Sequence, residues 1–280
     1  MTVAPASFEA LAAEGEGMSV VLGAALLARD VYPETDIAAL LGRLDELAAP
    51  LSARGFAALG LRAQGEALAA HLHGEHGFRG NAEEYDDPRN SLLPDVLSRR
   101  TGLPIALSLV YLEVANRAGA RASGVGFPGR FLVRLDDDPA DLATAVFLDP
   151  FAGGRILDED GIRELFYLAT HVDEPNYIPP YLVAVKPRAM LLRWLTNLAG
   201  AYLKRAELSR ALVVLDRIAT LCPGEAKPLR DRGLLALQLG APAAALADLE
   251  RVVAIDPHGE LGDEARGVIL ALRTLPDTRN

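Results

Sequence analysis

The stretch RRTGLPIALSLVYLEVANRAGARASGVGFPGRFLVRL, residues 99–135, decides the fold. Within it, residues 104–118 leave almost no polar face, which is typical of a helix buried on all sides at the centre of a domain. Residues 122–127 then alternate in polarity, a Pro-Gly pair makes a turn, and residues 130–135 return. The spacing therefore predicts a central helix followed by a pair of strands.

The regions on either side of this stretch complete a core with helices and strands. Upstream, residues 77–91 are polar and rich in turn formers, which predicts a loop. Ser91 is expected to cap the helix that follows, at residues 91–102. Downstream, residues 144–148 read as a third strand that ends at Asp149. Because these strands have short connections, we expect an antiparallel sheet.

The N-terminal region, residues 1–80, is predicted to be helical and to pack on the core at residues 81–170. Apolar residues recur there at helical spacing in three segments, namely residues 18–27, 35–50 and 54–72. After the core we expect an extended linker at residues 171–186, because prolines exclude a regular helix. The prolines in question are Pro175, Pro179, Pro180 and Pro187.

The C-terminal region, residues 187–280, contains a repeat. Pro223 and Pro257 are 34 residues apart, which is the tetratricopeptide period. Small residues recur at the same interval in the pairs Ala199 and Gly233, and Ala211 and Ala245. This pattern predicts two helical hairpins, and residues 261–275 supply a capping helix. Two repeats are fewer than an independent stack usually needs, so we expect the tail to pack against the core.

The composition narrows the classes of function. The formal net charge is −10, which argues against a nucleic-acid backbone as the partner. We expect no membrane association, because no basic amphipathic segment or long apolar run is present. The N-terminus lacks the features of a secretion signal, so the expected location is the cytoplasm. The single cysteine, Cys222, fits a small buried side chain.

Five strings carry a resemblance to a known family. They are GFRGN, YDDPRNS, RRTGLPIALSLVYLEVA, GVGFPGRFLVR and LDPFAGG, all between residues 77 and 154. The chain resembles the SirB-type family of bacterial transglutaminase-like proteins with a tetratricopeptide tail. That resemblance implies an α+β fold with a helical N-terminal region, a transglutaminase-like core with a small antiparallel sheet, and an all-α tail.

The resemblance also assigns the three positions of a catalytic triad. The cysteine position falls on Pro104, the histidine position on Arg130 and the aspartate position on Asp149. A triad needs a thiol or hydroxyl beside a base that a third group orients. Proline has no nucleophile, and arginine stays protonated at neutral pH. We therefore predict no catalytic residues, and we expect Arg130 and Asp149 to form an ion pair.

Two alternative hypotheses give a function to a cleft around these positions. A hydrolase or acyl transferase could be built on Ser108, one turn after Pro104, or on a bound metal. For Ser108 a hydrogen bond to the carbonyl one turn back is the simpler expectation. Arg130 could instead hold a carboxylate or phosphate in a small-molecule sensor. For the preceding loop, the simpler expectation is a solvated turn in which Asp87 and Asn90 bond the local backbone. The candidate cleft residues are Glu84, Tyr85, Asp87, Arg89, Asn90, Ser108, Arg130 and Asp149.

Three histidines, His71, His73 and His76, invite a metal site. No pair of them has the i, i+4 spacing that shares a metal on one helix, and no cysteine lies nearby. We therefore expect exposed polar residues at a helix end, and no metal or cofactor. The leading hypothesis for the whole chain is a pseudoenzyme that acts as a protein-interaction, scaffold or regulatory module, with another protein or a peptide as partner.

Overall fold

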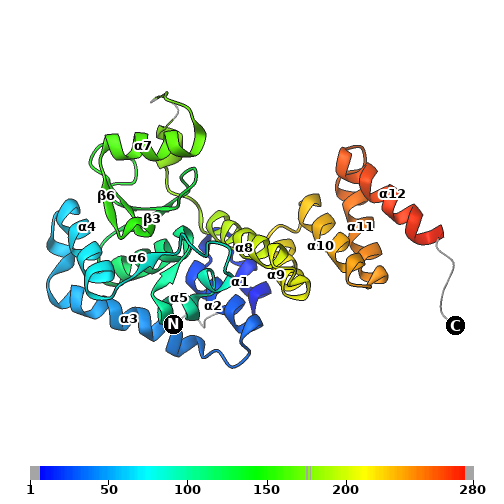
Figure 1. Ribbon diagram of the computed structural model, residues 1–280, viewed down its shortest axis with the longest axis horizontal. Coiled ribbons are helices and arrows are strands. Elements are labelled where there is room, and N and C mark those ends of the chain that lie inside the picture. Colours follow the sequence, from blue (N-terminus) through cyan, green and yellow to red (C-terminus); the bar gives the residue numbers. More distant parts are fainter. Residues whose placement is uncertain (1–6, 175, 177, 275–280) are drawn as a thin grey trace. The chain divides into compact units, whose positions relative to one another are not determined.

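The computed structural model describes residues 7–174, 176 and 178–274 (Figure 1). Contacts divide the chain into two compact units. Unit 1 contains Glu14–Trp194, and unit 2 contains Phe8–Ala13 together with the residues from Leu195 onward. The division falls inside helix α8, Pro187–Lys204, beyond the proline-rich stretch that the sequence favoured as a linker.

Unit 1 opens with helices. Ser19 and Asp36 cap α2 and α3, because their side chains accept hydrogen bonds from Leu22 N and Ala39 N. Helix α3 continues through Pro50, where the sequence predicted a stop. These elements are α2 (Val20–Val31), α3 (Ile37–Ala53), the 3-10 turns η1 (Gly15–Gly17) and η2 (Phe56–Ala58), α4 (Leu61–Ala69) and the π-helical turn η3 (Ala70–Glu75).

The centre of unit 1 is helix α6, Pro104–Arg117, on which eleven residues are buried. It follows α5, Leu93–Arg99, whose N-cap is Leu92, so the predicted cap at Ser91 is wrong by one residue. The two-residue strands β1 (Arg79–Gly80) and β2 (Thr101–Gly102) pair in parallel beside these helices. The short 3-10 helix η4, Pro88–Asn90, lies in the loop between β1 and α5.

A four-stranded sheet covers α6, in the order β3-β4-β5-β6. All its pairs are antiparallel, as the short connections predicted, and Val133 lies opposite Leu148. The strands are β3 (Ala122–Val125), β4 (Leu132–Leu135), β5 (Val146–Asp149) and β6 (Arg155–Leu157), with the 3-10 turn η5 (Pro150–Ala152) between the last two.

Helix α7 and the proline-rich stretch complete unit 1. Asp158 caps α7, Glu159–Thr170, by accepting a hydrogen bond from Gly161 N. The proline-rich stretch contains the 3-10 turn η7, Pro179–Leu182, and Ala184 forms a bridge with Val125 of the sheet. This part of the predicted linker is therefore attached to the core, while Pro175 lies outside the described residues.

Unit 2 is entirely helical. Gly233 is needed for close packing, because a Cβ there would come 3.1 Å from Asp248 Cβ. The short N-terminal helix also belongs to this unit: Glu9 pairs with Arg217 at 2.7 Å, and the Arg217 guanidinium lies over the Phe8 ring. Its helices are α1 (Phe8–Ala13), α9 (Leu208–Leu221), α10 (Ala226–Gln238), α11 (Pro242–Ile255) and α12 (Glu260–Thr274).

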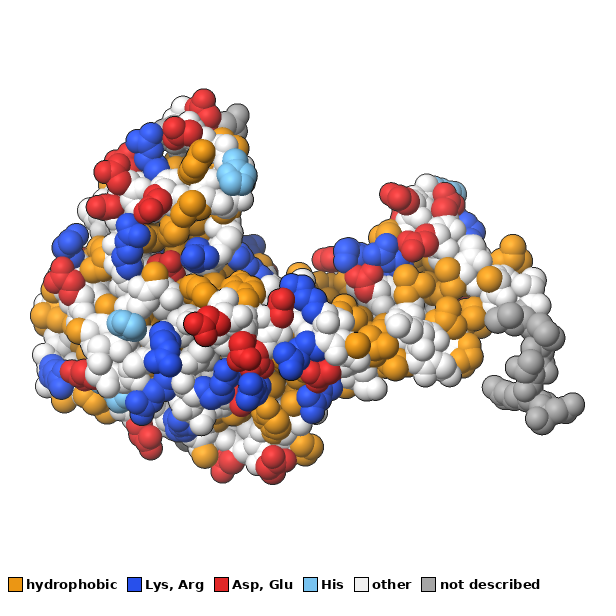
Figure 2. Space-filling view, in the orientation of Figure 1, with side chains coloured by type: hydrophobic (Ala, Val, Ile, Leu, Met, Phe, Trp, Pro, Cys, Tyr) orange, Lys and Arg blue, Asp and Glu red, His pale blue; other side chains and the backbone are white. Residues whose placement is uncertain are grey.

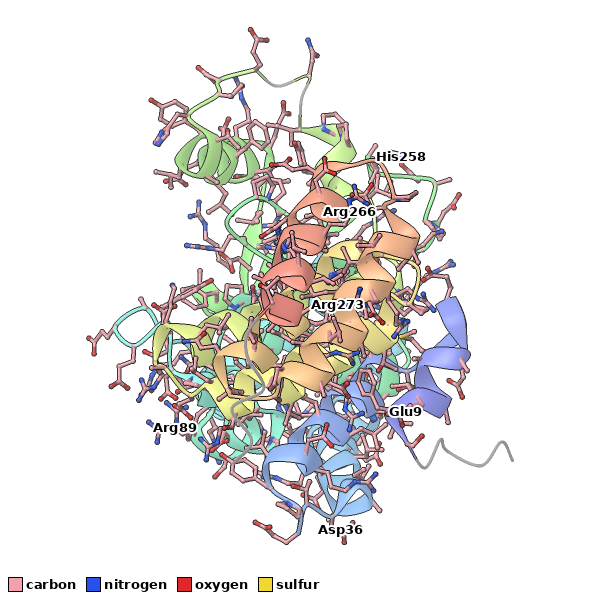
Figure 3. The ribbon with its side chains drawn as sticks, turned by 90° about the vertical axis from the view of Figure 1, so that its right-hand side faces the viewer. Glu9, Asp36, Arg89, His258, Arg266 and Arg273 are labelled. Atoms are coloured by element: carbon pink, nitrogen blue, oxygen red, sulfur yellow. The ribbon has the colours of Figure 1, made fainter. Side chains whose placement is uncertain are left out.

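Polar contacts tie the unit 2 helices together. Arg232 of α10 pairs with Asp248 of α11 at 2.5 Å, and Asp248 is buried. Arg273 of α12 reaches back to Glu250 of α11 at 2.6 Å, and Figure 3 shows Arg266 and Arg273 along the same helix α12. Cys222, which follows α9, is buried as predicted. None of the helices in the described residues combines the length and apolar content that crossing a bilayer requires.

Candidate functional site

Asp149 ends strand β5 and starts the turn η5. Its Oδ1 accepts hydrogen bonds from Phe151 N at 3.0 Å and from Ala152 N at 3.3 Å. The side chain is 2% exposed. Burial raises the pKa of this carboxyl, although the charge of Arg130 and the two backbone donors oppose that shift. Asp149 is thus a buried carboxylate whose orientation the backbone fixes.

Arg130 faces Asp149, and the predicted ion pair is present. Arg130 Nε lies 3.3 Å from Asp149 Oδ2, and the guanidinium lies 5.2 Å from the centre of the Phe151 ring. The pair is electrostatic, since Nε–H forms no well-aligned hydrogen bond. About a third of the Arg130 side chain is exposed (34%), and its Nη1 donates a hydrogen bond to Gly129 O at 3.1 Å.

Pro104 occupies the first position of α6 and is buried. Proline suits this position because its missing N–H would have no helical partner there. It offers neither a nucleophile nor a backbone donor at the start of the helix. Of the three positions that the resemblance assigns to a triad, only Asp149 carries a group that a cysteine-type triad uses.

Tyr111, on α6, lies near this carboxylate. Burial raises the pKa of its phenol, and the charge of Asp149 adds to the effect. The hydroxyl is buried and has no hydrogen-bond partner among the described residues. Gly154 packs against it, since a Cβ there would come 3.0 Å from the hydroxyl oxygen. The sequence alone did not single out Tyr111 as part of this region.

Ser108 is not placed as a nucleophile would need to be. It is fully buried, and its Oγ donates a hydrogen bond to Phe131 O at 2.8 Å. The expected bond to the carbonyl one turn back is therefore wrong, because the acceptor comes from the neighbouring hairpin. A nucleophilic hydroxyl needs its proton directed to a base, and here the proton is directed to a carbonyl.

Replacing Ser108 with alanine is expected to lower the free energy of unfolding by about 1–3 kcal/mol, because the Phe131 carbonyl loses its buried donor. Urea unfolding followed by circular dichroism measures the change. Ser98→Ala is the matched control, since Ser98 is exposed on the adjacent helix and its loss should cost less than about 0.5 kcal/mol. An equal effect of the two substitutions would contradict the assigned role of Ser108.

The loop before α5 is organised around Asp87. Arg89 holds this carboxylate through Nε and through Nη2, the latter at 2.7 Å from Oδ2, and Arg99 Nη2 lies 3.6 Å away. Burial raises the pKa of Asp87, but the hydrogen bonds and charge of Arg89, with the charge of Arg99, outweigh it and lower the pKa overall. The Arg89 side chain is 54% exposed and projects outward (Figure 3).

Asn90 joins the two ends of this loop. Its Nδ2 donates to Glu84 O at 2.7 Å, and its Oδ1 accepts from Asn81 Nδ2 at 3.2 Å. The local hydrogen bonds expected for Asp87 and Asn90 are present, but both side chains are buried, so the expectation of a solvated turn is wrong for them. These hydrogen bonds hold the loop in a defined conformation.

Tyr85 connects this loop to Arg130. It is 44% exposed and makes an edge contact with Phe151 at 6.1 Å between ring centres. We call Tyr85, Arg130, Asp149 and Phe151 the Arg130 cluster. The other candidates, Glu84, Asp87, Arg89 and Asn90, form the separate network of the loop, and Ser108 lies apart from both. Phe151, which the sequence did not single out, is the aromatic link within the cluster.

Two residues far apart in sequence set the position of the Arg130 cluster. A Cβ on Gly80 would come 2.5 Å from the Phe151 ring, so strand β1 requires glycine there. Arg193, on α8, donates from Nη2 to Arg130 O at 2.7 Å and to Phe127 O at 3.3 Å. Burial lowers the pKa of the Arg193 guanidinium. Neither contact has a signal in the local sequence.

A small apolar cavity adjoins Arg130. Its volume is about 140 Å³, and its walls are Pro128, Gly129, Arg130, Leu165, Leu168 and Ala169. Leu168 on α7 is 63% exposed, and the neighbouring Tyr167 is 51% exposed. On the face that Figure 2 draws, hydrophobic side chains lie beneath the part that contains α7, and charges of both signs are mixed over the rest of unit 1. The site therefore combines one half-buried cation with apolar surface.

Comparison with known proteins identifies the family. Residues 38–196 match the model of the transglutaminase-like superfamily, and residues 198–270 match a tetratricopeptide repeat model. The chain belongs to the transglutaminase-like superfamily. This transglutaminase-like protein is also 37% identical over 273 residues to a UPF0162 protein of Xylella fastidiosa, an alignment that covers 92% of both chains.

Other relatives extend this comparison. A UPF0162 protein of Vibrio cholerae is 30% identical over 253 residues, which cover 88% of this chain and 90% of the relative. F-box only protein 21 of Pongo abelii is 29% identical over 209 residues, which cover 70% of this chain but only 32% of that protein. The resemblance drawn from the sequence, the α+β fold class and the tetratricopeptide tail are all confirmed.

Proposed function

We propose that this transglutaminase-like protein is a non-catalytic module that binds a protein or peptide through the Arg130 cluster. The observation that carries the proposal is the Arg130–Asp149 ion pair. The family resemblance assigns these two residues to the positions of the imidazole and the carboxylate of an active enzyme, and they lie 3.3 Å apart. An arginine there cannot accept a proton at neutral pH, so the pair supports recognition and not general-base chemistry.

The absence of a nucleophile supports the same conclusion. Pro104 stands at the head of α6, and the hydroxyl of Ser108 donates to a backbone carbonyl. The buried Cys222 lies in unit 2, outside the transglutaminase-like region. The hydroxyl described near Asp149 is the Tyr111 phenol, and burial raises its pKa, so it stays protonated. Acyl transfer by a triad therefore has no support among the described residues.

The surroundings of Arg130 indicate the kind of ligand. A guanidinium pairs well with a carboxylate, and the adjoining cavity of about 140 Å³ accepts an apolar side chain. Tyr85, which is 44% exposed, adds an aromatic surface of the type enriched at binding hot spots. We therefore expect a peptide segment that pairs an acidic group with an apolar residue. The tetratricopeptide repeats supply a second surface of a kind that commonly binds proteins.

The test is an affinity purification with the wild type, Arg130→Ala and Arg155→Ala side by side. Arg155 is the matched control, since it is an exposed arginine in β6 that pairs with Glu164. Loss of one or more shared partners with Arg130→Ala, and their retention with Arg155→Ala, is the expected result. Identical partner sets for all three proteins would contradict a role for the cluster.

An activity test separates binding from chemistry. Purified wild-type protein should show no hydrolysis or acyl transfer and no labelling by a fluorophosphonate. Activity that disappears in Ser108→Ala, with the variant still folded by circular dichroism, would overturn the proposal and favour an enzyme with rearranged chemistry.

A further inference from the structure

A π-helical turn follows α4 and changes which side chains face one another. The turn η3, Ala70–Glu75, closes with a hydrogen bond from His76 N to His71 O at 3.0 Å. In an α-helix the corresponding bond spans four residues, so residues five apart face different directions. The wider turn instead places residue 76 over residue 71. Such turns occur frequently at functional sites.

The turn gathers three metal-binding side chains. His71 Nδ1 lies 2.7 Å from Glu75 Oε2, and the rings of His71 and His76 lie 4.6 Å apart at 81°. One ligand atom from each of the three residues falls within 4.8 Å of the other two. His71 is 2% exposed, so the expectation of an exposed histidine at this position is wrong.

In His71 and Glu75, the ring nitrogen and the carboxylate oxygen that face away from the other residue already have hydrogen-bond partners. His71 Nε2 lies 2.8 Å from Leu47 O, and because a carbonyl only accepts, Nε2 carries a proton. In the neutral ring, Nδ1 is then the lone-pair donor. Arg54 Nη1 donates to Glu75 Oε1 at 3.3 Å, which leaves Oε2 toward His71. Metal-binding histidines and carboxylates are typically oriented through their outer atoms in this way.

We propose that His71, Glu75 and His76 bind one divalent transition-metal ion, with zinc as the best match. Two imidazole nitrogens and one carboxylate oxygen form a ligand set that zinc accepts, with a fourth position left for water or another ligand. His76 also lines a cavity of about 200 Å³ together with Arg43 and Arg100. This cavity offers space for a small anion in the fourth position.

Neighbouring groups shift the pKa values of two of the three side chains. Desolvation lowers the pKa of His76, and the charges of His71 and Arg100 lower it further, whereas Glu75 raises it. Hydrogen bonds from His71 and Arg54 lower the pKa of Glu75. Where the hydrogen between His71 Nδ1 and Glu75 Oε2 is present, the metal replaces it and releases that proton to solvent.

The experiment is a titration of metal-free, full-length protein with Co²⁺ and then Zn²⁺. Visible absorption reports Co²⁺ coordination, and competition with a chromophoric chelator gives the zinc affinity. We expect one ion per chain, and at least about 10- to 100-fold weaker binding in Glu75→Gln and in His76→Gln, because loss of a ligand costs no less than loss of a group that orients one. His73→Gln is the matched control: His73 is exposed and its Nδ1 lies 2.8 Å from Phe78 O, so zinc affinity should be unchanged.

Two results would overturn the proposal. One is the absence of Co²⁺ and Zn²⁺ binding by the wild type, which would leave His71 and Glu75 as a simple hydrogen-bonded pair. The other is wild-type affinity in both Glu75→Gln and His76→Gln, which would place the ion elsewhere. Both variants change half-buried or exposed side chains, and circular dichroism checks that they are folded.

Discussion

Replacing Asp149 with alanine is expected to lower the free energy of unfolding by about 3 kcal/mol, as the sum of a lost cap and buried donors left without a partner. The carboxylate accepts from Phe151 N and Ala152 N, and it is the counter-charge of Arg130. Alanine removes all three interactions and leaves a gap under η5. Urea unfolding monitored by circular dichroism measures the loss.

Asparagine at the same position is the matched control. Its amide oxygen can still accept both backbone hydrogen bonds, and the partly exposed Arg130 can turn to solvent, so Asp149→Asn should cost less than about 1 kcal/mol. A loss as large as that of alanine would show that the charge, and not the cap, carries the stability of this turn.

The pH dependence of the two proteins should differ in a defined direction. The pKa of Asp149 is raised in the folded state, so the folded protein binds a proton over a pH range where the unfolded chain does not. The contribution of this group to stability is then fully present below the unfolded pKa and falls as the pH rises through the folded pKa. Asp149→Asn lacks this titration, so its stability relative to wild type should improve from acidic to neutral pH.

Trp194→Ala is expected to have the largest effect, about 3–5 kcal/mol of unfolding free energy, because a fully buried indole leaves a cavity. Trp194 is 0% exposed, and its Nε1 donates to Ser91 O at 2.8 Å. The side chain thereby attaches the end of the loop before α5 to helix α8. Loss of the donor also leaves a buried carbonyl without its partner.

The measurement has an internal probe, since Trp194 is the single tryptophan. Its fluorescence reports wild-type unfolding, while circular dichroism compares the variants. Leu203→Ala is the control on the same helix: Leu203 is 44% exposed, and its loss should cost less than about 0.5 kcal/mol. A loss under about 1 kcal/mol for Trp194→Ala would contradict the close packing described for this side chain.

The features that the sequence predicted correctly are local ones. The buried helix, the hairpin after it and the repeat depend on spacings within one segment, and the structure contains all three. The Arg130–Asp149 pair followed from the resemblance, because both residues hold assigned positions in a known fold. A feature can thus be predicted from the sequence when it depends on residues close together in the chain, or when the family assigns its residues to known positions.

The features that were missed depend on contacts between distant segments. Phe151 acquires its place from Tyr85 and from the missing side chain of Gly80, and Arg193 reaches the hairpin from a later helix. Ser108 bonds across to the hairpin for the same reason. No periodicity in one segment reports which residue of another segment lies opposite.

The π-helical turn η3 also affects how this chain aligns with its relatives. Such a turn holds one residue more than an α-helical turn, so deleting a single residue between Ala70 and Glu75 would convert it to regular helix. Every side chain on one side of the deletion would then rotate by about 100° relative to the other side. A relative with a one-residue gap at this point can thus keep both histidines in its sequence and still lose their juxtaposition.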